Sequence, residues 1–370
     1  MKKLITKKLK QLFKQAGYGL YKIIYGRIKE VVYSEDETHV KKQKIQLTNR
    51  LPYRVYTILK ARLYTDTVNN LAIIHDDKLL EGPSFQYKNV KNSNIQENFV
   101  LKNGTPRIKK KLNGTIFVLL TGGAGNDNYW HWLFDVLPRL ELLNKQINIK
   151  EIDYFLFPDI HQKFQIETLD ALNIPKHKRL SSKKYRHFEA DKIITVDHPY
   201  VLKNDPSNEI QNMPEWIIEW LRDTFLKNMK FDQNNLKEKI YIDRSDSKSN
   251  LNHTRKITNE DLVKKLLIKN GFSIIQLSNL SFLEQVSLFR NASKIVGLHG
   301  GGFANIIFCN PKTLVLEIKS STAGAVIENL AKKNNLNYRD ISITPHEHAY
   351  NNQQGFVNVP LDVLEKKINY

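Results

Sequence analysis

The chain has 370 residues, with 57 Lys and Arg against 38 Asp and Glu, and the difference gives a formal net charge of +19. This length suits two domains, and the basic surplus favours a diphosphate or another polyanion, an anionic membrane surface, or nucleic acid as the ligand. The single cysteine, Cys309, excludes a disulfide within the chain. The sequence contains neither an apolar run of about 18 residues that could span a membrane nor the apolar core of a secretory signal, and we expect a cytoplasmic protein.

Residues 1–30 combine basic and apolar positions in a helical pattern. The apolar positions with helical spacing are Leu4, Ile5, Leu9, Leu12, Phe13 and Ala16. Lysines occupy the opposite face, and a basic amphipathic helix of this kind can lie on an anionic membrane surface. Alternatively, the apolar stripe packs on the protein and the lysines are only solvated. We expect Gly17 and Gly19 to end or kink the helix.

From residue 31 to about 118 the patterns are short and mixed, with Asn, Lys, Gly and Pro clusters between apolar runs. Apolar runs at 54–59, 70–74 and 114–120 predict strands, and the residues between them predict loops.

The strand that ends at Leu120 runs into a glycine-rich segment and then into a helix expected over 129–140. His131 and Asp135 are four residues apart, so both project from one face of this helix. An imidazole beside a carboxylate can act as a general base, because the acid orients the ring and raises its basicity. The alternative is a buried structural histidine beside a surface carboxylate, and the spacing alone does not choose between them.

Between residues 141 and 229 strands and helices alternate, which favours a parallel α/β domain. The expected strands cover 153–157 and 191–196, and the expected helices cover 164–172 and 213–229. A polar stretch at 230–237 follows, and we place a domain boundary there. The sequence then divides into a basic helix (1–30), an N-terminal α/β domain (31–229) and a C-terminal domain (230–370).

The C-terminal part repeats a strand–helix unit, which is typical of a Rossmann-like domain. The expected strands cover 238–242, 272–277, 295–298 and 313–318, and the expected helices cover 259–269, 281–289 and 360–368. Thr258 with Asp261, and Ser281 with Glu284, have the spacing of helix N-caps. We expect the last helix to return toward the first domain.

A glycine-rich turn separates the strand ending at residue 298 from a short helix expected to begin at Phe303. The turn consists of His299, Gly300, Gly301 and Gly302. Because glycines carry no Cβ, a ligand can approach this backbone closely, and the helix N-terminus that follows favours an anion such as phosphate. Ligands of open α/β sheets also bind beyond the carboxyl ends of strands. We interpret the turn as a nucleotide-diphosphate site; the alternative is a tight turn without a ligand.

Three charged residues can complete such a site. Arg244 follows the strand at 238–242, and Arg255 lies further along the next loop; a guanidinium group binds diphosphate oxygens through two parallel N–H donors. Solvated loop charges are the alternative for both arginines. Glu317 closes the strand at 313–318, and a carboxylate there suits ribose hydroxyls.

Several common motifs are absent. The sequence has no D-x-D pair, no H-E-x-x-H motif and no cysteine cluster, so we predict no catalytic metal held by the protein. An esterase that used the H-G-G-G turn would need a G-x-S-x-G elbow, which does not occur. There is no Walker A motif, and the glycines at 123–125 give only half of a dinucleotide fingerprint.

Taken in order, these motifs resemble those of glycosyltransferase family 61. The matching residues are Asn128 to Asp135 with Pro138 and Arg139, Tyr241 to Arg244, Arg255 to Glu260, Leu283 to Gln285, His299 to Gly302 with Asn305, and Glu317. The resemblance covers about residues 115–320 and implies a GT-B architecture, in which two Rossmann-like domains face each other across a cleft. It also implies an inverting, metal-independent transferase of bacterial capsule or other surface-polysaccharide assembly, with no cofactor besides a nucleotide-sugar co-substrate.

The resemblance gives the candidate residues their roles. His131 or Asp135 would take the proton of the acceptor hydroxyl, on a glycan or lipid-linked glycan bound by the N-terminal domain. The donor-binding residues would be Arg244, Arg255, His299, Gly300, Gly301, Gly302, Asn305 and Glu317, with the arginines and the turn at the diphosphate and Glu317 at the ribose.

Two other classes of protein stay open. One is a catalytically inactive, membrane-associated scaffold of a polysaccharide assembly, which would keep the fold without the reaction. The other is a nucleic-acid-binding protein, which the charge suggests; however, no binding signature with stacking aromatic residues occurs, and we expect no nucleic-acid partner.

Overall fold

The computed structural model describes residues 2–33, 38–48, 51–65, 71–84, 94–120, 127–203, 205–227, 239–245, 255–347 and 354–369. The chain folds into two compact units. The first comprises residues 1–162 and 173–209, and the second comprises residues 163–172 and 210–370. The boundary expected at 230–237 lies outside the described residues, and helix α7 (Glu215–Leu226) belongs to the second unit.

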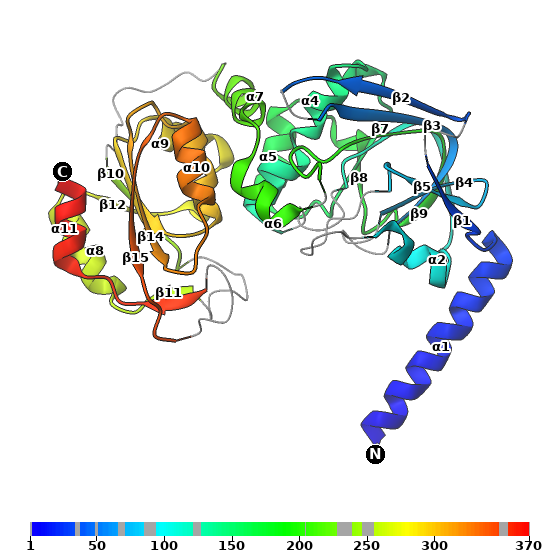
Figure 1. Ribbon diagram of the computed structural model, residues 1–370, viewed down its shortest axis with the longest axis horizontal. Coiled ribbons are helices and arrows are strands. Elements are labelled where there is room, and N and C mark those ends of the chain that lie inside the picture. The colour runs from blue at the N-terminus through cyan, green and yellow to red at the C-terminus, as the bar shows by residue number, and fades with distance from the viewer. Residues whose placement is uncertain are drawn as a thin grey trace. The chain divides into compact units, whose positions relative to one another are not determined.

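Within the described residues, the first unit contains a nine-stranded mixed sheet in the order β1–β5–β4–β3–β9–β6–β7–β8, with β2 paired to β3 (Figure 1). Its strands are β1 (Glu30–Tyr33), β2 (Val40–Ile45), β3 (Tyr53–Thr65), β4 (Leu71–His75), β5 (Lys78–Glu81), β6 (Lys110–Val118), β7 (Tyr154–Phe157), β8 (Arg179–Ser181) and β9 (His187–Val196). The strands from β9 to β8 in this order are parallel, whereas β3 is antiparallel to β2, β4 and β9. This confirms the α/β prediction for the parallel part only.

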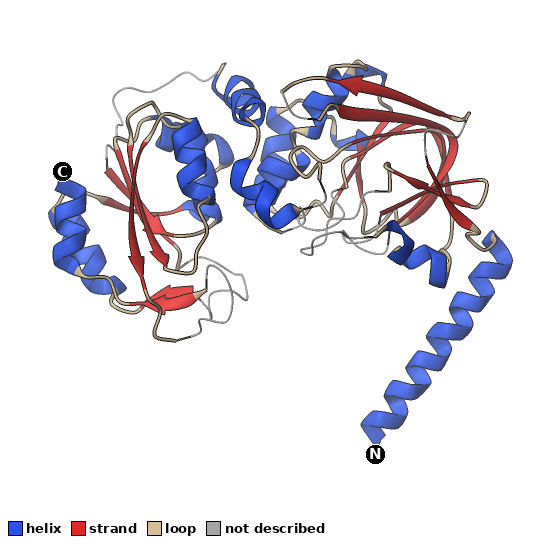
Figure 2. Cartoon of the chain, viewed as in Figure 1, coloured by secondary structure: helices blue, strands red, loops and turns tan. Residues whose placement is uncertain are grey.

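Helix α1 precedes the first strand of this unit, and the other helices follow later strands (Figure 2). They are α1 (Lys2–Tyr25), η1 (Ile95–Glu97), α2 (Phe99–Asn103), α3 (Tyr129–His131), η2 (Trp132–Val136), α4 (Arg139–Asn144), η3 (Ile149–Glu151), η4 (Lys176–Lys178) and α6 (Pro206–Glu209). Helix α1 continues past Gly17 and Gly19 and ends before Gly26, whose φ of +81° only glycine adopts readily. The expectation that the earlier glycines end the helix is therefore wrong.

The helix expected over 129–140 is divided by one π-helical segment, η2. The amide of Leu137 donates to the carbonyl of Trp132, five residues earlier, at 3.1 Å. The cause is Pro138, which has no N–H to donate and whose ring would clash with the carbonyl four residues earlier in an α-helix. The wider turn places all of η2, including Asp135, in the buried interior.

The second unit contains a five-stranded parallel sheet in the order β12–β10–β13–β14–β15. The strands are β10 (Lys239–Asp243), β12 (Ser273–Gln276), β13 (Lys294–Leu298), β14 (Leu314–Ser320) and β15 (Asn337–Ile343), and β11 (Arg255–Ile257) pairs separately with β16 (Gly355–Val357). Numbered along the chain, the sheet order is 2-1-3-4-5, which is a doubly wound order. The Rossmann-like prediction for this part of the chain is confirmed at the level of topology.

Helices cover both faces of this sheet (Figure 1). They are α5 (Lys163–Ala171), η5 (Ile210–Asn212), α7, α8 (Glu260–Lys269), η8 (Leu277–Asn279), α9 (Phe282–Arg290), η9 (Gly301–Phe308), α10 (Val326–Lys333) and α11 (Leu361–Asn369). Buried residues of α8 and α11 form one hydrophobic cluster with Tyr241 and Val296 of the central strands. Helix α11 thus completes the core of its own unit, and the expectation that it returns to the first domain has no support in these contacts.

Two local predictions about helix starts differ in outcome. The capping box of α9 is confirmed, because the Ser281 hydroxyl accepts from the amide of Glu284 while the Glu284 carboxylate accepts from the amide of Ser281. The Thr258 cap is wrong: Asn259 occupies the N-cap position, and the Thr258 hydroxyl donates to the carbonyl of Val357 at 3.3 Å. Pairing of β11 with β16 draws Thr258 away from the helix start.

We expect Ser281→Ala to lower the free energy of unfolding by about 1 kcal/mol, because the first turn of α9 loses its side-chain acceptor. Urea unfolding followed by circular dichroism measures this. Glu284→Gln keeps an acceptor of the same shape and should cost less; an equal or larger loss in Glu284→Gln would contradict the capping explanation.

Candidate active site

The strand order of the second unit indicates where its sheet would bind a ligand, at the carboxyl ends of two central strands. The chain passes from β10 outward to β12 and then returns to β13 on the other side of β10. Crevices of doubly wound sheets open at such a switch point, beyond the carboxyl ends of the two strands. Strand β10 ends at Asp243, just before Arg244, and β13 ends at Leu298, just before the glycine-rich turn. The predicted arginine and the predicted turn therefore meet at this point.

Two guanidinium groups converge on one backbone carbonyl in this turn. Arg255 Nη1 donates to the oxygen of His299 at 2.8 Å, and Arg244 Nη1 donates to the same oxygen. Burial lowers the pKa of Arg255 to about 10, and the charge of Arg244 lowers it further while Glu317 opposes the shift. Two like charges held this close repel each other, and an anion bound beside them would relieve that repulsion. The group is a candidate diphosphate site.

The glycines of the turn allow close packing. A Cβ on Gly300 would lie 2.6 Å from Nη1 of Arg244, and one on Gly302 would lie 3.0 Å from Cδ1 of Leu277. At Gly300 the missing Cβ thus makes room for a protein guanidinium group, where the sequence suggested room for a ligand. Helix η9 begins at Gly301, earlier than the expected start at Phe303, and it is a 3₁₀-helix.

A buried chain of hydrogen bonds fixes the side chain of His299. Its Nδ1 contacts Oε1 of Glu317, and the Tyr338 hydroxyl donates to Oε2 of Glu317 at 2.5 Å. Glu317 is fully buried, and burial together with Glu317 raises the pKa of Tyr338. Both carboxylate oxygens therefore contact protein groups, so Glu317 orients the imidazole of His299 in this structure. Tyr338 was not identified from the sequence, because its contact depends on the pairing of β14 with β15.

Asn305 lies in the packed interior of the second unit. Its side-chain amide is fully buried and donates to Oε1 of Gln285 at 3.0 Å, while the Gln285 amide donates to the carbonyl of Leu277 at 2.9 Å. These bonds connect η9 with α9 and η8. The structure thus supports a packing role for Asn305.

The first unit has a comparable switch point between β6 and β9. These strands are parallel neighbours, while β7 and β8 continue the sheet on the other side of β6. The segment after β6 leads to His131, and the segment after β9 leads to Tyr200. Residues from two distant parts of the sequence therefore share one end of the sheet.

His131 and Asp135 form the predicted pair. Nδ1 of His131 lies 2.9 Å from Oδ2 of Asp135, and the Tyr200 hydroxyl donates to Oδ1 at 2.7 Å. Asp135 is fully buried, whereas 17% of the His131 side chain is exposed. Burial by itself would raise the pKa of Asp135, but His131 and His198 more than offset this effect, and the pKa lies well below its usual range. The carboxylate is thus ionised and orients the His131 ring.

Other buried groups hold Asp135 in place. Nε2 of His198 lies 3.6 Å from Oδ2 of Asp135, and burial lowers the pKa of His198 despite this carboxylate. Arg139, also buried, donates to the backbone carbonyls of Asp135 and Val196, each at 3.2 Å. His198 and Tyr200 were missed by sequence reasoning. The available signal was their position directly after the strand expected at 191–196.

The model of the family Glycosyltransferase 61 matches residues 129–316, which is half of the chain. The chain belongs to this family, and the family implies a glycosyltransferase that takes a sugar donor and a glycan acceptor. The match includes His131, Asp135 and Tyr200 of the first unit and Arg244, Arg255 and His299 of the second, and it ends just before Glu317. It lies within the region on which the sequence resemblance rested. No curated protein matches the chain.

Arg244→Ala should weaken binding of nucleoside diphosphates about tenfold or more, because a charge-assisted donor is lost. Gly300→Ala should act in the same direction, since its methyl group would displace Arg244. Titration calorimetry with several nucleoside diphosphates and with inorganic pyrophosphate measures both effects. Lys256→Ala is the matched control, because it removes an exposed charge next to Arg255. Equal affinities for Arg244→Ala and Lys256→Ala would exclude Arg244 from the site.

Proposed function

We propose that the chain is an inverting glycosyltransferase that transfers a sugar from a nucleotide-sugar donor to a glycan or lipid-linked glycan in surface-polysaccharide assembly. The observation that carries this proposal is the convergence of Arg244 and Arg255 on the carbonyl of His299 at the switch point of the second unit. The chain belongs to family 61, and in such a transferase this pair of cations would bind the diphosphate of a donor.

The donor half of the proposal rests on charge. A sugar leaves its nucleotide as negative charge develops on the diphosphate, and donors already in place stabilise that charge without reorganising. Arg244 and Arg255 supply two cationic groups in fixed positions, and each guanidinium can bind two oxygens at once. Together with the absence of a D-x-D pair, this supports a metal-independent reaction. The GT-B arrangement implied by the resemblance stays part of the proposal.

The acceptor half rests on the His131–Asp135 pair. An inverting transfer is one displacement, which needs a single base for the acceptor hydroxyl. Asp135 is a poor candidate, because it is fully buried and both its oxygens contact Tyr200 or His131. His131 is partly exposed, and its Nδ1 faces Asp135, so Nε2 is the nitrogen through which it would take the proton. We therefore assign His131 as the base and Asp135 as the residue that orients it.

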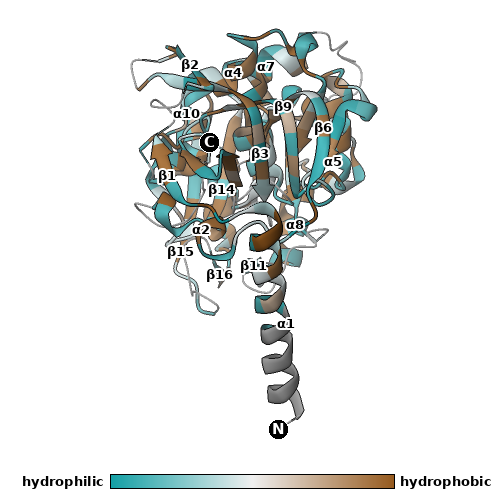
Figure 3. Ribbon diagram, turned by 90° about the vertical axis from the view of Figure 1, so that its right-hand side faces the viewer, coloured by the Kyte–Doolittle hydropathy of each residue, from teal (hydrophilic) through white to brown (hydrophobic). Residues whose placement is uncertain are grey.

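Exposed apolar side chains near the C-terminal end of α1 support the proposal that an anionic membrane surface is a further partner. Tyr18 packs edge-on against Phe99 with ring centroids 5.8 Å apart, whereas Leu20, Ile23 and Ile24 are 56%, 83% and 54% exposed. The described part of α1 thus carries hydrophobic and hydrophilic residues together (Figure 3). No described helix is long and apolar enough to cross a membrane. We propose peripheral attachment of this helix to the cytoplasmic face of a membrane.

His131→Ala should lower kcat by about 10²–10⁴-fold, which is the usual contribution of a general base, with a smaller change in KM. Asp135→Asn should also lower kcat, because the neutral amide lacks the negative charge that raises the basicity of the ring. The donor is first identified by thermal shift against a panel of nucleotide sugars, and turnover is then measured with it. His177→Ala, an exposed histidine of η4, is the control. Near-normal turnover in both variants would refute the assignment, and donor binding without any transfer or hydrolysis by the unmodified chain would favour the scaffold.

Replacing both Leu20 and Ile23 by Gln should reduce binding to anionic phosphatidylglycerol vesicles by about tenfold, because exposed apolar surface is removed from the helix. Vesicle flotation measures the bound fraction. Ile108→Gln is the matched control, since Ile108 is 73% exposed but lies outside α1. Unchanged binding of the double variant would mean that α1 has no such role.

A further inference from the structure

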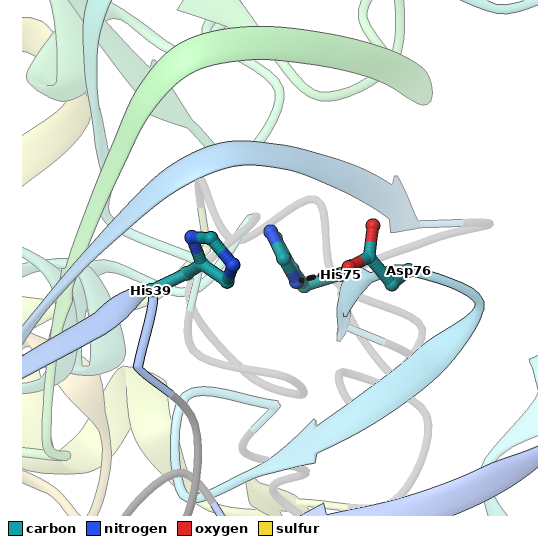
Figure 4. Close-up of side chains that lie close together, drawn as sticks. All are labelled: His39, His75 and Asp76. Atoms are coloured by element: carbon teal, nitrogen blue, oxygen red, sulfur yellow. Dashed lines mark ion pairs between the residues drawn. The ribbon is translucent and has the colours of Figure 1, made fainter.

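A second cluster of potential ligands lies in the first unit, among residues that the proposed reaction does not use. His39 precedes β2, His75 is the last residue of β4, and Asp76 begins the turn to β5 (Figure 4). The two imidazole rings face each other with centroids 4.4 Å apart and planes tilted by 31°. One ligand atom from each of the three residues lies within 4.8 Å of the others. Two imidazoles and one carboxylate thus meet in a volume that suits a single ion.

His75 supplies the second observation. Its side chain is 5% exposed, and within the described part of the chain its buried Nδ1 has no hydrogen-bond partner. The nearest carboxylate atom, Oδ2 of Asp76, lies 3.5 Å away, which is long for a hydrogen bond. Two ligands of one tetrahedral zinc ion, at its usual bond lengths, lie about 3.3 Å apart. The separation of these atoms therefore suits shared ligation better than direct bonding.

The hairpin turn leaves the carboxylate of Asp76 available to bind an ion. Asp76 and Asp77 both have positive φ angles, +46° and +61°, as a two-residue turn with the twist of a β-hairpin requires. Asp77 is anchored, because its carboxylate accepts from Arg62 at 3.1 Å and its carbonyl accepts from the amide of Lys29 at 2.8 Å. The Asp76 side chain is 77% exposed beside the buried ring of His75. The turn is thus fixed through one aspartate while the other faces the imidazoles.

We propose that His39, His75 and Asp76 bind a divalent transition-metal ion, with Zn²⁺ as the best match. Two imidazole nitrogens and a carboxylate oxygen are common zinc ligands, and water would complete a tetrahedron. The carbonyl of His39 accepts from the amide of Leu59 at 3.2 Å, so the segment before β2 already lies along β3. The ion would join that segment to the β4–β5 hairpin. Its role is to stabilise the first unit, and it takes no part in the sugar transfer.

The test uses the full chain, freed of metal, and titrates it with Zn²⁺ by calorimetry. We expect one ion per chain, and a rise in Tm of about 5 °C or more when Zn²⁺ is a hundredfold above its dissociation constant. Co²⁺ should give the visible absorption bands of a tetrahedral site. Both readouts are independent of transferase activity, so the proposal can fail while the proposed function stands.

His39→Ala and Asp76→Asn should each weaken Zn²⁺ binding at least tenfold and remove the tetrahedral cobalt spectrum. Both positions are exposed, so the variants should fold, and circular dichroism checks this. His177→Ala, another exposed histidine, should bind Zn²⁺ like the unmodified chain. Zinc binding that persists in both variants, or no binding at micromolar Zn²⁺, would overturn the proposal and leave two stacked imidazoles.

Discussion

The carbonyl oxygen of His299 organises the second unit's candidate site, since two cationic side chains from different segments donate to it. Arg244 comes from the end of β10 and Arg255 from the start of β11, and the repulsion between them contributes to the lowered pKa of Arg255. Both guanidinium groups donate to this one carbonyl oxygen, which partly offsets their repulsion. Gly300 leaves room for this arrangement, because a Cβ there would lie 2.6 Å from Nη1 of Arg244, which would have to shift. The proposed diphosphate would balance this concentration of positive charge.

Each unit also contains a histidine that is held by a buried carboxylate at the carboxyl ends of parallel strands. In the first unit Asp135 holds His131, and in the second Glu317 holds His299. Each carboxylate has a tyrosine hydroxyl on its other oxygen, which satisfies a buried charge that would otherwise be costly. The difference lies in exposure: His131 is partly exposed, whereas His299 is buried. That difference favours proton transfer at His131 and a positioning role at His299.

Local chemistry explains how the His131–Asp135 pair forms within an irregular helix. Pro138 prevents an ordinary α-helical turn, and the resulting π segment buries Asp135 among Trp132, Leu133 and Phe134. Burial of a carboxylate is unfavourable unless donors are near, and His131 and Tyr200 provide them, with the ring of His198 3.6 Å away. Segments far apart in the sequence therefore meet here.

The sequence by itself determined the features that depend on neighbouring residues. These include the strand before the glycine turn, the capping box of Ser281 and Glu284, the spacing of His131 and Asp135, and the motifs that indicate the family.

The tertiary structure alone decided the contacts between strands and segments. The structure adds that Asn305 packs against Gln285 and that Glu317 contacts His299, while their predicted places at the donor stay predictions. The predicted cap at Thr258 is wrong, because Thr258 donates to Val357 next to β16. His198, Tyr200, Tyr338 and the facing rings of His39 and His75 likewise depend on which strands become neighbours. Spacing along a helix or a turn is fixed by backbone geometry, whereas strand order and register follow from burial of the whole sheet, which no local pattern specifies.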